Sequence, residues 1–255
     1  MEWRIKLDIF LSDFEHMKDV VGVMVCGSYI TGNPGKHSDL DVHIILDNNV
    51  KYRERGNRVI DGLVIEYFAN PPYQILRYFD EDLTDKSLMS QVQFATGEII
   101  MDEVGEVAAL KEKAIAMIDD FYVNPPDASV SELAKYFMWD MLDDLQDAHE
   151  TNRADFDFLY FTALDSLLRE YTSAINRPYN RKAILGNIQD AHVREKYLLR
   201  ELPDETISRL ISGAITATGK NEKVNIYQQL TNAIWDKFGG FNIDGFRLKG
   251  GLNDL

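Results

Sequence analysis

The 255-residue sequence contains a single cysteine, Cys26, and this scarcity excludes a disulfide within the chain. One cysteine, in an apolar stretch, is typical of a protein from a reducing compartment, so we expect a cytoplasmic protein in which Cys26 belongs to the core. Basic residues are also scarce, with 27 Lys and Arg against 42 Asp and Glu and a net charge of −15. Because nucleic-acid affinity comes largely from basic side chains on phosphates, this balance argues against DNA or RNA as the main partner.

Long apolar runs are missing as well. No stretch approaches the roughly eighteen apolar residues that indicate a membrane-spanning helix, and the first residues lack the pattern of a secretory signal peptide. We therefore expect a soluble protein with no membrane partner. The length suits either one large domain or two small ones, and it is sufficient for a hydrophobic core.

The stretch that is richest in information begins with an apolar run, residues 21–26, which has the β-branched content of a buried strand. The run stops at Gly27-Ser28, and a loop with further glycines follows. A second predicted strand, Leu40 to Leu46, carries Asp39 and Asp41 at its start. Side chains two positions apart on a strand share a face, so these two carboxylates lie side by side and repel each other unless a cation binds between them. Mg²⁺, which prefers carboxylates and phosphates, fits that position.

The Gly-Ser turn predicts the other half of such a site. Glycine allows the backbone to approach a ligand closely, and a short helix beginning at Ser28 would offer free N–H groups to a polyphosphate. The Ser28 hydroxyl adds one more hydrogen-bond donor. A triphosphate bound there would bring its metal ion against Asp39 and Asp41.

These residues resemble a known signature. Gly27-Ser28, then ten residues, then Asp39-Leu-Asp41-Val is similar to the motif of the DNA polymerase β-like nucleotidyltransferase superfamily. The fuller spelling, Gly-Ser-x-x-x-Gly followed by Ser-Asp-Leu-Asp, is most similar to small bacterial members such as the aminoglycoside and lincosamide nucleotidyltransferases. The resemblance covers roughly residues 20–120 well and the remainder in outline.

The resemblance implies a nucleotidyltransferase that depends on Mg²⁺ or Mn²⁺ and uses ATP or another NTP. It implies that Asp39 and Asp41 bind the metal together with a third carboxylate on a later strand. Glu66 is the candidate, because it lies among apolar residues in 62–68, where a carboxylate is costly to bury without a cation. The nucleotide phosphates would be bound by Gly27, Ser28 and Ser38.

The rest of the first half predicts the elements of a mixed sheet with helices. Residues 2–19 have the periodicity of an amphipathic helix, and Asp61-Gly62 predicts a tight hairpin that makes the Glu66 strand antiparallel to the strand before it. Helices are expected from Tyr73 and over residues 105–121, with a short strand near 97–102 between them. His43 alternates with strand residues and is a further candidate for the carboxylate face.

The second half is predicted to be helical. Asn124-Pro-Pro-Asp127 is the best domain boundary, and helical spacing follows near residues 130–150, 154–176, 181–200, 204–218 and 222–238. We therefore predict an α+β protein with a nucleotidyltransferase domain at residues 1–124 and an acceptor-side helical bundle at 125–255. The tail after Gly239-Gly240 is expected to be irregular.

Two groups in the predicted bundle are candidates for work on the substrates. Asp140, Asp144 and Asp147 share a helix face, and the resemblance implies a general base on a helix there, for which we choose Asp144. A solvated acidic face explains the same residues without a function. Lys182 belongs to the one basic cluster, residues 177–182, and the resemblance implies a lysine that reaches the triphosphate. A cluster that only flanks a helix end explains it equally well.

The sequence thus predicts transfer of a nucleoside monophosphate from an NTP, ATP in the first instance, to a hydroxyl of a small acceptor, with release of pyrophosphate. The negative net charge favours a cationic acceptor of the aminoglycoside type, which would make the protein an antibiotic-resistance enzyme. Two alternatives remain at this stage. One is a nucleotidyltransferase that modifies a protein or an RNA, as toxin–antitoxin enzymes do, and the other is a non-catalytic nucleotide-binding module.

Overall fold

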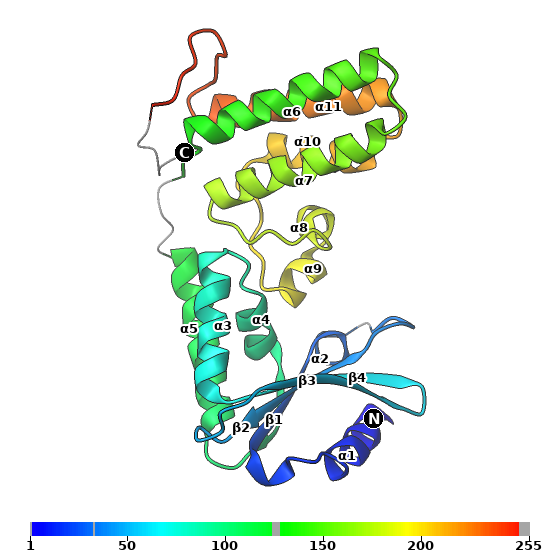
Figure 1. The fold of residues 1–255 in the computed structure, drawn as a ribbon, viewed down its shortest axis with the longest axis vertical. Coiled ribbons are helices and arrows are strands. Elements are labelled where there is room, and N and C mark those ends of the chain that lie inside the picture. The colour runs from blue at the N-terminus through cyan, green and yellow to red at the C-terminus, as the bar shows by residue number, and fades with distance from the viewer. Residues whose placement is uncertain (1, 33, 124–127, 250–255) are drawn as a thin grey trace. The chain divides into compact units, whose positions relative to one another are not determined.

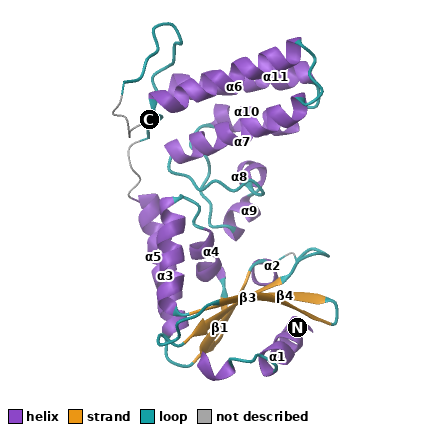
Figure 2. Cartoon of the chain, in the orientation of Figure 1, coloured by secondary structure: helices purple, strands orange, loops and turns teal. Residues whose placement is uncertain are grey.

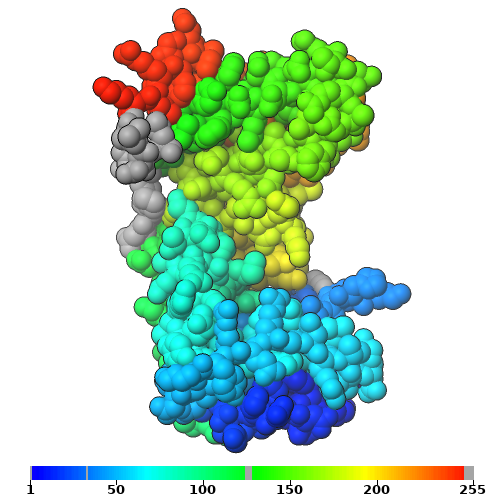
Figure 3. Space-filling model, viewed as in Figure 1, coloured from blue at the N-terminus to red at the C-terminus, as the bar shows by residue number. Residues whose placement is uncertain are grey.

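The fold is given by a computed structural model that describes residues 2–32, 34–123 and 128–249. The chain forms two compact units, Met1–Asn124 and Pro125–Leu255, each of which is described by itself (Figure 1). The residues of the predicted linker, 124–127, and the end of the tail, 250–255, lie outside the described residues. The space-filling view shows the first unit in blue to green and the second in green to red (Figure 3).

The first unit contains a five-stranded mixed sheet with the strand order β3-β4-β2-β1-β5 (Figure 2). The pairs β1–β2, β1–β5 and β3–β4 are antiparallel, while β2 and β4 run parallel. The strands are β1 (Val20–Cys26), β2 (Leu40–Leu46), β3 (Glu54–Ile60), β4 (Leu63–Asn70) and β5 (Glu98–Asp102).

The turn between β3 and β4 is the predicted Asp-Gly hairpin. Asp61 and Gly62 have φ angles of 46° and 80°, which is the left-handed pair that a type I′ turn requires. The turn pairs Ile60 with Leu63, and this register extends to Glu54 and Ala69. The hairpin therefore fixes which β3 residues lie beside Glu66.

Helices cover the two faces of this sheet unequally. On one face, Trp3, Leu7 and Phe10 of α1 (Glu2–Ser12) pack on inward-pointing residues of the strands. On the other face, α3 (Pro72–Thr84), α4 (Met89–Thr96) and α5 (Glu106–Val123) pack on Met24 and Ile45 (Figure 1). The remaining short helices are the 3-10 helix η1 (Met17–Asp19) and α2 (Ser28–Thr31). Because β2 side chains alternate, Asp41 and His43 lie on the same face as Ile45, next to the part that α3 and α4 cover.

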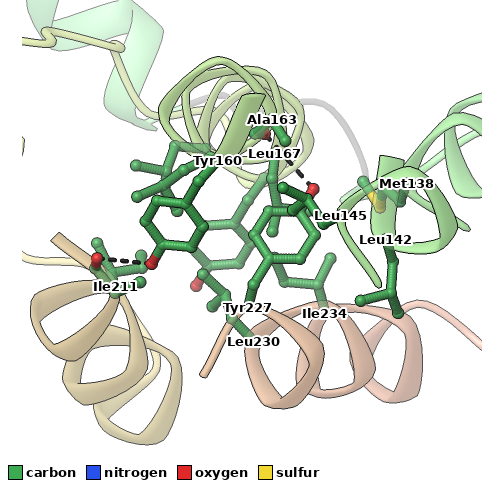
Figure 4. Close-up of a cluster of buried hydrophobic side chains, with 14 of the residues drawn as sticks. Met138, Leu142, Leu145, Tyr160, Ala163, Leu167, Ile211, Tyr227, Leu230 and Ile234 are labelled. Atoms are coloured by element: carbon green, nitrogen blue, oxygen red, sulfur yellow. Dashed lines mark hydrogen bonds between the residues drawn. The ribbon is translucent and has the colours of Figure 1, made fainter. Parts of the chain in front are cut away.

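The second unit is a helical bundle, as predicted. Its longer helices are α6 (Glu132–Glu150), α7 (Phe156–Ala174), α10 (Glu205–Thr216) and α11 (Lys220–Lys237), with the short α8 (Ile184–Gln189) and α9 (Ala191–Lys196) between them. They enclose one apolar core in which Tyr160 and Tyr227 are fully buried (Figure 4). The Tyr160 hydroxyl donates to the carbonyl oxygen of Ala214 at 2.7 Å, so this buried polar group has a partner.

Two helices differ from their predicted extent. The predicted helix 2–19 ends at Ser12, whose hydroxyl donates to the Ile9 carbonyl, and the chain continues through turns to η1. The predicted helix 181–200 is two short helices, because Asp190 leaves the helical conformation and its side chain caps α9 by accepting from the His192 N–H. Serine and aspartate compete with the helix for backbone hydrogen bonds, and that competition ends both helices.

Among the described residues, no helix is both long enough and apolar enough to cross a membrane. After α11, residues 239–249 contain neither helix nor strand, in agreement with the irregular tail that the sequence predicts.

Candidate active site

Three carboxylates that are far apart in the sequence converge on one face of the sheet. Asp39, Asp41 and Glu66 each have an oxygen within 4.8 Å of the others. The convergence follows from strand pairing, because the parallel register of β2 and β4 sets Asp41 directly beside Glu66. Asp39, just before β2, lies two residues from Asp41.

The carboxylates of this group lie close enough for their negative charges to oppose one another. Burial, followed by the negative charges of Asp39 and Glu66, raises the pKa of Asp41 from 3.8 to about 6. The donors are carboxylate oxygens alone, which are the ligands that Mg²⁺ and Mn²⁺ prefer over softer metals. The three side chains therefore fit a hard divalent cation.

Gly27 lies against this group at the end of β1. Its φ of 74° and ψ of −157° belong to a region that only glycine enters readily. A Cβ atom at this position would lie 2.1 Å from Oδ2 of Asp41, so no other residue fits without displacing the carboxylate. Glycine here thus serves both the turn and the close approach of backbone to Asp41.

The Gly-Ser turn opens the helix α2 at Ser28, as predicted. The Gly27 carbonyl accepts from the N–H groups of Ile30 and Thr31 at 3.1 and 3.0 Å, and from the Thr31 hydroxyl. The first N–H groups of a helix have no partner within it, which leaves them available to an anion. Ser38, later in the loop, accepts from the Gly35 N–H through its hydroxyl at 2.8 Å, so this hydroxyl holds the loop closed.

Arg55 is a neighbour of the carboxylates that sequence reasoning missed. Its Nε and Nη2 donate to Oε1 of Glu66 at 3.2 and 2.6 Å, and its guanidinium lies 4.8 Å from the Phe68 ring centre. Glu66 was expected to need a cation, and the Arg55 guanidinium provides one at Oε1. The Asp-Gly turn could have revealed this contact, because its register pairs Arg55 with Phe68, the next residue after Glu66 on the same face of β4.

His43 shares the carboxylate face but is enclosed by protein. It is 8% exposed, its Nε2 lies 3.3 Å from Oε1 of Gln93, and its ring contacts those of Phe68 and Phe94. Burial lowers the pKa of His43 to about 4, so the imidazole is neutral near pH 7. His43 therefore contributes a neutral aromatic wall and no charge.

Asp144 and Lys182 belong to the second unit, which is described by itself. Asp144 lies on an exposed face of α6 together with Asp140 and Asp147. Lys182 is exposed in the turn before α8, where its backbone N–H donates to Oδ1 of Asn180.

The basic cluster around Lys182 is organised by one carboxylate. Arg181 donates through Nε and Nη2 to the two oxygens of Asp165, both at 2.7 Å, and Arg169 donates to the same group. These bonds hold the pKa of Asp165 far below its usual range, with Arg181 the largest cause. Arg181 is thereby committed to an ion pair, whereas no ion pair of Lys182 occurs among the described residues.

The sequence matches a known protein family over much of the first unit. Residues 7–115 match the family described as a nucleotidyltransferase domain, and this range contains Gly27 and all three carboxylates. Among solved structures, the chain is similar to a nucleotidyltransferase-like protein from Exiguobacterium sibiricum 255-15. The TM-score is 0.43, the sequences are 10% identical, and the alignment covers 92% of this chain and 73% of that one. No curated protein matches the chain.

Proposed function

We propose that residues 7–115, which match the nucleotidyltransferase-domain family, form a domain of the DNA polymerase β-like superfamily, and that the protein is a transferase dependent on Mg²⁺ or Mn²⁺. It moves a nucleoside monophosphate from ATP, or another NTP, to a hydroxyl of a small acceptor, and pyrophosphate is released. The observation that carries this proposal is the convergence of Asp39, Asp41 and Glu66 within 4.8 Å. Three adjacent carboxylates are expensive to maintain unless a divalent cation binds them.

Each candidate residue has a role in this reaction. Asp39, Asp41 and Glu66 hold the metal, which supplies positive charge to the phosphate oxygens. Gly27, Ser28 and Ser38 bind the phosphates through the loop and the first turn of α2.

The transfer itself is a single displacement at phosphorus. The acceptor oxygen forms a bond to the α-phosphorus, the bond from that phosphorus to the bridging oxygen breaks, and pyrophosphate leaves with the electron pair. A carboxylate receives the hydroxyl proton, and our candidate for it is Asp144 of the helical unit. Lys182 is our candidate for neutralising the phosphates during transfer, since no ion pair competes for it among the described residues.

The acceptor we propose is cationic, as aminoglycoside-type antibiotics are, and the helical unit would bind it. Support comes from the three exposed aspartates on one face of α6, Asp140, Asp144 and Asp147, and from the net charge of −15. Such a surface attracts cations, and the attraction weakens with salt. We retain the cytoplasm as the proposed location because the one cysteine is a free thiol.

The decisive variant is Asp41→Asn, compared with Asp8→Asn, which makes the same chemical change on the exposed side of α1. Pyrophosphate release from Mg²⁺–ATP should fall by at least about 100-fold in Asp41→Asn and stay normal in Asp8→Asn. Undiminished release in Asp41→Asn contradicts the assignment. The acceptors to be tested are aminoglycosides, lincosamides, neutral sugars, a protein mixture and an RNA mixture, and product formation with each is measured at low and at high salt. A protein or RNA product without any cationic small-molecule product would favour the macromolecular alternative.

The same variant has a stability readout in the absence of metal. The folded pKa of Asp41 is raised to about 6, so its charge opposes folding at pH 7 and the opposition disappears as pH falls from 6 to below 4. Asp41→Asn should therefore stabilise the metal-free protein at pH 7 by about 1–2 kcal/mol, a value reduced for solvent screening. Urea unfolding at pH 7 and pH 4 measures this gain. Mn²⁺ should stabilise the wild type and leave Asp41→Asn nearly unchanged.

A further inference from the structure

A cavity of about 550 Å³ lies beside the carboxylates, entirely within the first unit. Its walls come from β2, β3 and β4 on the sheet side and from α3 and α4 on the helix side. The deepest residues are buried and mostly apolar, namely His43, Phe94 and Ile75, with the half-buried Phe68 beside them.

Arg55 connects the cavity with the carboxylate site. Its side chain lines the cavity and at the same time donates to Glu66. Phe68, another lining residue, lies two positions after Glu66 on β4, so both side chains project from the same face. A molecule in the cavity would therefore have one end next to Glu66.

The cavity lies on the side of the carboxylates away from Gly27. Along the strand order, Gly27 follows β1, Asp41 is on β2 and Glu66 is on β4, while the cavity extends beyond Glu66 to β3. If the Gly27 loop binds the leaving phosphates, as the proposed function holds, then in-line displacement requires the acceptor on the opposite side of the carboxylates. That is the side of the cavity.

The charged groups at the rim already have partners, whereas the floor is formed by rings. Asp82 accepts from the N–H and hydroxyl of Ser90, and Glu81 accepts from Arg77. Below them, the rings of Phe68, Phe94 and His43 pack closely, with centroid separations of 5.3 Å and 4.7 Å from His43. A floor of this kind gains from covering an apolar ring and offers a polyol few hydrogen-bond partners, of which the Nδ1 atom of His43 is one.

We propose that this cavity is the acceptor subsite, and that the acceptor is an alcohol whose reacting hydroxyl lies next to an apolar ring seated on Phe68 and Phe94. This inference rests on the proposed function and narrows its substrate class. Among cationic alcohols, it favours those with a single reacting hydroxyl beside an apolar ring over the aminoglycosides, which are covered with hydroxyl and amino groups. It also assigns recognition of the ring to the sheet-bearing unit.

The test fills the mouth of the cavity. Met89 lines it and is 64% exposed, so Met89→Trp adds bulk there without entering the core. The matched control is Val104→Trp, because Val104 is also 64% exposed and does not line the cavity. The probes are 2-phenylethanol, a ring with one hydroxyl, and myo-inositol, a ring covered with hydroxyls.

Binding is followed on the full chain by amide chemical shifts, without metal or nucleotide. We expect 2-phenylethanol to shift the resonance of Gln93 in the wild type and in Val104→Trp, and to bind about tenfold more weakly to Met89→Trp. We expect myo-inositol to shift none of these. Equal binding of the two probes, or equal binding of 2-phenylethanol to both variants, overturns the proposal.

Turnover supplies the second readout. With Mg²⁺–ATP and ring-bearing alcohols as acceptors, Met89→Trp should raise the KM of the alcohol about tenfold and leave the KM of ATP unchanged. A rise in the KM of ATP alone would assign the cavity to the nucleotide base and overturn the acceptor role. Normal pyrophosphate release with lost ring binding refutes this inference but leaves the proposed function intact. If the ring still binds but ATP releases no pyrophosphate with any alcohol as acceptor, the proposed function is refuted, and the acceptor role of the cavity with it.

Discussion

Replacing Gly27 by alanine tests the closest contact of the carboxylate site. The added Cβ would lie 2.1 Å from Oδ2 of Asp41, whereas ordinary contacts begin near 3.4 Å. The carboxylate must therefore move by more than about 1 Å, and a displacement of that size costs roughly 100-fold in rate when the group positions a reacting centre. The backbone conformation adds about 1–3 kcal/mol of strain for any residue other than glycine.

Gly32→Ala is the matched control for this prediction. Gly32 has a φ of 90° and a ψ of 157°, which is similarly restricted to glycine, but a Cβ there meets nothing within 4 Å. Both variants should lose about 1–3 kcal/mol in urea unfolding, since both carry the backbone strain. Only Gly27→Ala should also lose about 100-fold in pyrophosphate release and the stabilisation by Mn²⁺. If Gly27→Ala keeps normal turnover, or if Gly32→Ala loses as much turnover, the displacement of Asp41 is not the cause.

Two further predictions concern the helical unit. Asp165→Asn should lower the free energy of unfolding by about 1–2 kcal/mol at pH 7, because Asp165 binds Arg181 and Arg169 as a carboxylate. The pKa of Asp165 is depressed in the folded protein, so its contribution to stability is present above the unfolded pKa of about 4 and is lost as the pH falls below that value. If the urea midpoints of the wild type and Asp165→Asn differ equally at pH 7 and pH 2, this reasoning is wrong. Lys182→Ala should weaken transfer about tenfold and leave the urea midpoint unchanged. A large loss of stability with normal kinetics would show instead that Lys182 only supports the helix end.

The parts of the fold that were predicted correctly are those specified by neighbouring residues. Asp61-Gly62 determines its own turn, and the turn determines the register of β3 and β4. In the same way, Gly27-Ser28 predicts its own turn, because Gly27 can adopt a backbone conformation that other residues avoid and Ser28 begins a helix. The hairpin follows from such a local pattern, whereas the approach of Asp41 to Glu66 was implied by the family resemblance and depends on the long-range parallel pairing of β2 and β4.

The parts that were missed depend on competition or on long-range contacts. Ser12 and Asp190 end helices because their side chains bond to nearby backbone groups, although the apolar periodicity around them continues. The cavity could not be predicted because Met89 and Phe94 reach it only through the packing of α4 on the sheet. Periodicity indicates that a helix has an apolar face but does not specify where that face leaves space.

The position of β3 at the edge of the sheet also bears on aggregation. Its second edge has no neighbouring strand in the described part of the chain, and an open edge of that kind can pair with a strand from another molecule. The strand carries Glu54, Arg55 and Arg58, and long charged side chains on an edge discourage such pairing. The arginine that binds Glu66 therefore also helps to prevent aggregation, and replacing it by an apolar β-branched residue would endanger solubility together with the site.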